Sequence, residues 1–79
     1  MKREIDLKFY GLIGNEEEIH LEIYEILGKC LTHIASAKKT VSRAGILAHL
    51  VNEIEAQSCD YTRKLYRVAI EMVGVRKPE

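Results

Sequence analysis

Residues 15–35, NEEEIHLEIYEILGKCLTHIA, form the stretch that decides the fold. Apolar residues recur there at spacings of three and four, which is the period of an α-helix with one apolar face. They are Ile19, Ile23, Ile26, Leu27, Cys30, Leu31 and Ile34. Asn15 and Glu18 match a capping box, in which side chains satisfy free backbone amides at the helix start. The three glutamates after Asn15 suit the positive end of the helix dipole, so we interpret them as structural and not as acids or bases.

Two further segments have the same helical period. Ser42 can cap the first of them, and Ser58 or Asp60 can cap the second. Their apolar positions are Ile46, Leu47, Leu50, Val51 and Ile54 in the first, and Tyr61, Leu65, Val68, Ala69 and Met72 in the second. We therefore predict an all-α fold, a small three-helix bundle with helices over about residues 15–36, 42–57 and 60–74. Residues 1–14 fit either a flexible arm or a short helix.

Length and charge restrict the class of protein. A chain of 79 residues has room for one domain, here residues 1–79, and its 47% hydrophobic and 30% charged residues are typical of a folded helical protein. Twelve basic and twelve acidic side chains cancel, so no general attraction to nucleic acid or anionic membrane is expected. No apolar run is long enough to span a bilayer, and two cysteines are too few for a disulfide framework. We expect a cytoplasmic protein without membrane insertion.

Apolar residues remain once a single small core has been assigned. Leu21 and Tyr24 lie off the main face of the first helix, and the third helix has a second apolar set. Gly28 interrupts the first helix at a cost of roughly 1 kcal/mol relative to alanine, which indicates close approach of another backbone. A homodimer explains these features better than exposure to water does. The predicted dimer interface comprises Leu21, Tyr24, Gly28, Tyr66, Ile70 and Val73.

Candidate chemical sites are sparse. Cys30 and His33 lie one turn apart and could supply half of a zinc site, with His20, His49 or Cys59 completing it. A structural zinc site normally shows two such pairs, and the apolar face already accounts for Cys30. The sequence has no phosphate-binding glycine loop, no nucleophile elbow and no dinucleotide fingerprint. We therefore predict no metal site, no cofactor and no catalytic residues, and a protein that is not an enzyme.

Basic side chains form two groups that could contact a partner or the phosphates of DNA. They are Lys38, Lys39 and Arg43 around the start of the second helix, and Arg63, Lys64 and Arg67 on the third. The second helix offers Arg43, His49 and Asn52 beside acidic Glu53 and Glu55, which is a poor set for reading base edges. Any DNA binding is therefore expected to be weak and independent of sequence.

Three helical segments within residues 15–73 read EILGKCLTHI, VSRAGILAHLVNEIE and YTRKLYRVAIEMV. They resemble the corresponding segments of the bacterial biofilm-development and two-component connector family YmgB/AriR. The resemblance implies a three-helix protein that dimerises and adjusts biofilm formation and stress responses, and it carries no catalytic motif. It also implies action on a phosphorelay through a sensor kinase or response regulator, while DNA binding has been attributed to the family as well. A non-catalytic connector that binds a signalling protein is the leading hypothesis, and a DNA-binding transcriptional regulator is the alternative.

Overall fold

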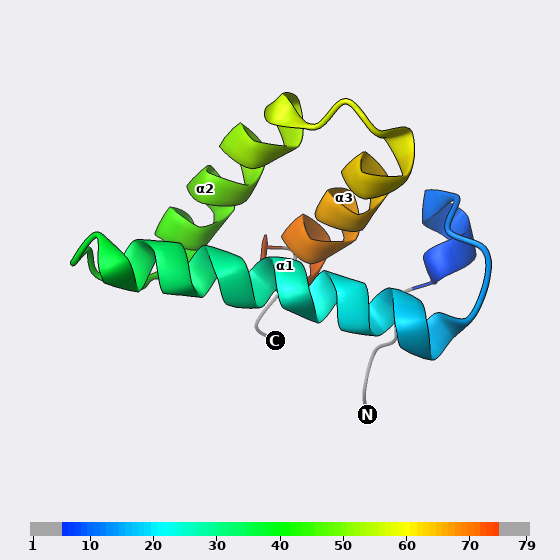
Figure 1. Cartoon of the computed structure of the whole chain (residues 1–79), viewed down its shortest axis with the longest axis horizontal. Helices are drawn as coiled ribbons and strands as arrows, with labels where there is room; N and C mark the ends of the chain where they lie inside the picture. Colours follow the sequence, from blue (N-terminus) through cyan, green and yellow to red (C-terminus); the bar gives the residue numbers. More distant parts are fainter. Residues whose placement is uncertain (1–5, 75–79) are drawn as a thin grey trace.

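Three α-helices and one short 3-10 helix make up the fold. The computed structural model describes residues 6–74, so the first part of the expected arm, residues 1–5, lies outside the described residues. The elements are η1 (Leu7–Tyr10), α1 (Glu16–Ser36), α2 (Arg43–Ala56) and α3 (Asp60–Gly74). α2 and α3 lie side by side, and α1 runs across both of them (Figure 1). The predicted all-α three-helix fold is confirmed.

Side-chain caps fix where the first two helices begin. The Asn15 side-chain oxygen accepts a hydrogen bond from the Glu18 amide at 3.0 Å. The Ser42 hydroxyl oxygen accepts one from the Gly45 amide at 3.1 Å. Both contacts satisfy amides that have no partner inside the helix, as the sequence predicted.

The start of α3 differs from the prediction. The carbonyl of Cys59 accepts the first hydrogen bond of the helix, from the Arg63 amide at 3.0 Å, so Cys59 occupies the capping position. The prediction of Ser58 or Asp60 was wrong because Asp60 is already inside the helix, where its carboxylate pairs with Lys64 at 3.2 Å. Hydrogen bonds from the backbone amide and hydroxyl of Thr62 lower the pKa of the Cys59 thiol. Cys59 therefore stands directly before the first turn of this helix.

The core lies where α1 crosses α2 and α3. It consists of Leu7, Leu12, Ile19, Ile23, Cys30, Ile34, Leu50, Leu65, Val68 and Ala69. Burial of each large aliphatic side chain stabilises the fold by about 1.5–3 kcal/mol. α2 contributes Leu50 alone to the fully buried set, while α3 contributes three residues and contacts each of the other elements. α3 is thus the central helix of the bundle.

The segment before α1 is part of this core. Asp6 caps η1, and Gly11 ends it with a left-handed backbone (φ 82°) that favours glycine. The turn buries Leu7 and Leu12, and η1 packs against α3. Burial and the neighbouring Glu71 carboxylate of α3 raise the pKa of Tyr10. Through η1, the segment before α1 therefore packs against α3, the last helix of the bundle.

The helices are too short or too polar to cross a membrane. None of the helices within residues 6–74 combines the length and the apolar character of a membrane span. This agrees with the absence of a long apolar run noted in the sequence.

Candidate interaction surface

An apolar stripe runs along the outward face of α1. Leu21, Tyr24 and Leu31 are 64%, 54% and 41% exposed, although each is a large hydrophobic side chain. At about 100° per residue these positions share one side of the helix, opposite the side that carries Ile23 and Cys30. We call Leu21, Tyr24, Gly28 and Leu31 the α1 stripe.

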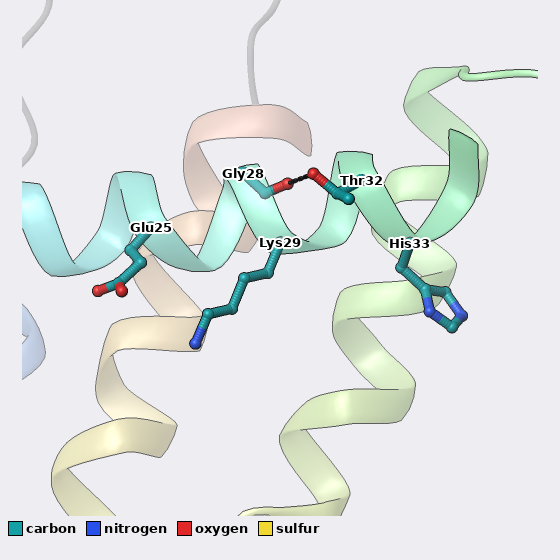
Figure 2. A pocket seen from close by; sticks show the side chains of 5 residues that line it. All are labelled: Glu25, Gly28, Lys29, Thr32 and His33. Atoms are coloured by element: carbon teal, nitrogen blue, oxygen red, sulfur yellow. Dashed lines mark hydrogen bonds between the residues drawn. The ribbon is translucent and has the colours of Figure 1, made fainter. Parts of the chain in front are cut away.

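Gly28 lies in the middle of the α1 stripe and faces open space. A Cβ atom added there meets nothing within 4 Å, so no backbone of the same chain approaches it. The Thr32 hydroxyl donates a hydrogen bond to the Gly28 carbonyl at 2.9 Å (Figure 2). Beside it is an open hollow lined by Glu25, Gly28, Lys29, Thr32 and His33 (Figure 2). A glycine that weakens a helix and has no packing role within the chain leaves room for an outside helix.

Charge divides α1 into two halves around Gly28. The N-terminal half carries the exposed acids Glu16, Glu17, Glu18, Glu22 and Glu25. Lys29 follows Gly28, and Lys38 and Lys39 lie in the turn just beyond the helix. The α1 stripe therefore has an acidic end and a basic end.

One of these acids is tied to α3. The Tyr61 hydroxyl donates a hydrogen bond to the Glu22 carboxylate, which raises the pKa of Tyr61 to about 12. Ionisation of Tyr61 would place two negative charges side by side. This contact fixes the N-terminal half of α1 relative to α3.

The structure separates the interface residues predicted from sequence. Leu21, Tyr24 and Gly28 share the α1 stripe, whereas Tyr66 and Ile70 are partly buried against the core. α3 contacts α1 on one side and α2 on another, and this accounts for its second apolar set within a single chain. Burial also raises the pKa of Tyr66. Val73 is half-buried on the same helix.

Sequence reasoning did not single out Phe9 and Ile13, which are 79% and 82% exposed. They lie in the segment between Asp6 and the start of α1. The apolar residues of this short segment have no period that shows which of them turns inward. Leu7 and Leu12 take the inward positions, so Phe9 and Ile13 face outward.

The two basic groups lie on different parts of the molecule. Lys38, Lys39 and Arg43 belong to the α1–α2 connection and the start of α2, at one end of the view in Figure 1. The first turns of α3, with Arg63 and Lys64, lie toward the other end. Lys64 is also neutralised by its ion pair with Asp60.

Histidines and cysteines come together only in part. The rings of His33 and His49 lie 4.8 Å apart between their centroids, with Cys30 in the same cavity. Within residues 6–74 no three His, Cys, Asp or Glu residues are grouped so as to hold a metal ion. Burial raises the pKa of the Cys30 thiol. Cys30 and Cys59 are both free thiols.

Comparison with known proteins places the chain in a family. The sequence profile of the biofilm development protein family YmgB/AriR matches residues 20–75. The chain belongs to this family. No curated protein and no solved structure gives a match to the chain.

The YmgB/AriR match covers the α1 stripe from Leu21 onward and all of α2. The segment with Phe9 and Ile13 precedes the matched residues, as do the glutamates at the start of α1. The α1 stripe therefore lies within the part of the chain that matches the family, and the exposed side chains of Phe9 and Ile13 lie outside it.

Proposed function

We propose that the protein is a non-catalytic regulator of biofilm development that acts as a homodimer and binds a signalling protein of a two-component pathway. The observation that carries this proposal is the α1 stripe, in which exposed apolar side chains flank a glycine with open space above it. Contiguous exposed apolar surface on a small protein marks an interaction site. The family supplies the biological setting, biofilm development.

A second copy of the chain suits the α1 stripe. Gly28 lies near the middle of α1, and small residues at a helix crossing allow two backbones to approach closely. When two α1 helices cross in an antiparallel manner at Gly28, the acidic half of each faces the half that carries Lys29. A two-fold axis brings the same patch of both copies together, so this arrangement is self-complementary in shape and charge.

A different surface is left for the signalling partner. Phe9 and Ile13 are strongly exposed and precede the three acids at the start of α1. An apolar anchor beside acidic side chains fits a partner with an apolar pocket and a basic rim. We assign the segment from Phe9 to Glu18 to a sensor kinase or response regulator.

Catalysis and DNA binding have less support. The Cys30 thiol shares a cavity with His33 and His49, but it contacts the Ile46 carbonyl and burial raises its pKa, so it is a poor nucleophile. The two basic groups are far apart in the fold, so they do not form one phosphate-binding surface. DNA binding is expected to be weak and to disappear near physiological salt.

Sedimentation equilibrium of the purified chain tests the dimer. A charge buried in the interface without a partner is unfavourable, so Tyr24→Asp should weaken association by about tenfold or more. Val51→Asp is the matched control, because Val51 is a similarly exposed apolar residue on α2. A wild-type mass that stays at the monomer value at every concentration would contradict the dimer.

Crosslinking in living cells tests the partner. A photoreactive amino acid at Ile13 should give an adduct with a sensor kinase or response regulator, identified by mass spectrometry. Replacing Glu16, Glu17 and Glu18 with lysine should abolish the adduct, while Val51→Asp should preserve it. Adducts with DNA alone, resistant to physiological salt, would favour direct transcriptional regulation instead.

A further inference from the structure

Two histidines from different helices lie against one another with their rings tilted. His33 lies in the last turn of α1 and His49 lies in α2, with ring centroids 4.8 Å apart and ring planes tilted by 31°. His33 is exposed and His49 is half-buried, so both rings can exchange protons with water. Histidine is the side chain whose ordinary charge change falls between about pH 5 and pH 8. In Figure 2 the His33 ring points toward α2.

We propose that the His33–His49 pair is a pH-sensitive contact that holds α1 against α2 when at least one ring is neutral and loosens this contact when both are protonated. Two neutral rings, or one neutral and one charged ring, can stack without repulsion. Two imidazolium rings at this separation repel each other.

The groups around the His33–His49 pair can accommodate one positive charge but not two. Lys29 and Cys30 of α1, Glu53 of α2 and Tyr66 of α3 line the cavity that contains both rings. Lys29 and Glu53 have opposite charges, and burial raises the pKa of Cys30 and of Tyr66, so these two stay neutral at acidic pH. The carbonyl end of α1 and the Glu53 carboxylate can accommodate one positive charge. A second positive charge faces the first.

The pair acts on the contact between α1 and α2. This contact is less extensive than the one between α2 and α3. Beneath the histidines, the Cys30 thiol contacts the Ile46 carbonyl at 4.0 Å, and Leu50 is fully buried. Repulsion between the rings therefore acts on the C-terminal part of α1 and the facing part of α2, while the α2–α3 contact is spared.

The size of the effect follows from the separation. Two unit positive charges 4.8 Å apart in a medium as polar as water raise the unfolding equilibrium constant by about fourfold. Salt screens the repulsion and reduces this to about twofold. The unfolded chain separates the rings and accepts both protons without this repulsion. When both rings are protonated, this repulsion is present in the folded protein alone, so it raises the unfolding equilibrium constant at acidic pH.

Urea unfolding of the full chain at about pH 7.5 and about pH 5 tests the proposal. The ratio of the unfolding constants at the two pH values should be about two- to fourfold larger for the wild type than for His33→Gln or His49→Gln. Combining both substitutions should lower it no further, since either one removes the pair. His20→Gln is the matched control, because His20 lies on α1 beside Tyr24 and has no histidine partner there. All samples are compared at one concentration, since association also stabilises the folded state.

Nuclear magnetic resonance provides an independent measurement. The nuclear Overhauser contact between the ring protons of His33 and His49 should weaken at about pH 5. Amide exchange, corrected for intrinsic rates, should accelerate at about pH 5 over residues 30–36 and 46–53 more than in α3. Equal pH ratios for the wild type, His33→Gln and His49→Gln, or an unchanged ring contact at about pH 5, would overturn the proposal. His33→Gln is at an exposed position, so its folding does not depend on core packing.

Discussion

Replacing Gly28 with alanine should change folding and association in opposite directions. Alanine is about 0.8–1.0 kcal/mol more favourable than glycine inside a helix, and the added Cβ meets nothing within 4 Å in the same chain. The isolated protomer should therefore gain about 1 kcal/mol in free energy of unfolding. For a domain of this size that gain raises the melting temperature by about 4–8 °C.

The same methyl group lies where two α1 helices are proposed to cross. A symmetric dimer takes up two of them, so the helices must separate at their closest point. We expect the dissociation constant to rise about tenfold, which corresponds to about 1.4 kcal/mol. Thermal unfolding at concentrations below the dissociation constant reports the protomer, and sedimentation equilibrium reports association.

Asn52→Ala supplies the control for this experiment. Asn52 is exposed on α2, away from the α1 stripe, and its replacement should also stabilise the helix, by about 0.5 kcal/mol. It should leave the dissociation constant unchanged. If Gly28→Ala leaves association unchanged or strengthens it, the crossing of two helices at Gly28 is refuted.

Three other predictions concern groups outside the α1 stripe. Phenolate absorbance should show Tyr61 ionising near pH 12, and Glu22→Gln should return its pKa toward 10.0. Because folding favours the protonated phenol, the contact with Glu22 stabilises the protein below about pH 10, and this stabilisation is lost above about pH 12. Iodoacetamide should modify Cys59 well before Cys30, since hydrogen bonding lowers the pKa of the first and burial raises that of the second; equal rates by mass spectrometry would argue against the buried thiol. Gly11→Ala should lower the free energy of unfolding by about 1–2 kcal/mol, because the backbone there has a φ of 82° and the Lys64 side chain occupies the place of the added methyl group. An unchanged urea midpoint would show that the turn relaxes without cost.

The parts of the fold that depend on neighbouring residues could be predicted from the sequence. Asn15 and Ser42 cap their helices as predicted, because a cap needs only amides two or three positions ahead. Periodicity also predicts the core face of α1 at Ile19, Ile23, Cys30 and Ile34, but it wrongly placed Leu31 there, which is 41% exposed on the α1 stripe. Cys59 was missed at the start of α3, since thiols are not among the residues preferred at that position.

Features that depend on distant residues could not be predicted in this way. Tyr66 and Ile70 formed a second apolar stripe in the sequence, but the sequence does not tell whether another helix of the same chain or a second copy covers it. The contact between the His33 and His49 rings joins α1 to α2 at positions 16 residues apart in the sequence, so only the packed bundle reveals it. For the candidate surface, the sequence placed Leu21 and Tyr24 off the main core face, where the structure has them, and it singled out Gly28 as a point of close backbone approach.

The packing of η1 on α3 sets an order of events during synthesis. Leu7 and Leu12 leave the ribosome before α1, yet α3, on which η1 packs, is the last of the three helices to emerge. Until then these leucines are open to water or to a chaperone, and α1 and α2 can form only a partial bundle. Since contacts between distant parts of the chain slow folding, closure of the N-terminal segment should be a late step. A nascent chain arrested before α3 would therefore keep Leu7 and Leu12 exposed, so that a chaperone could recognise it as incompletely folded.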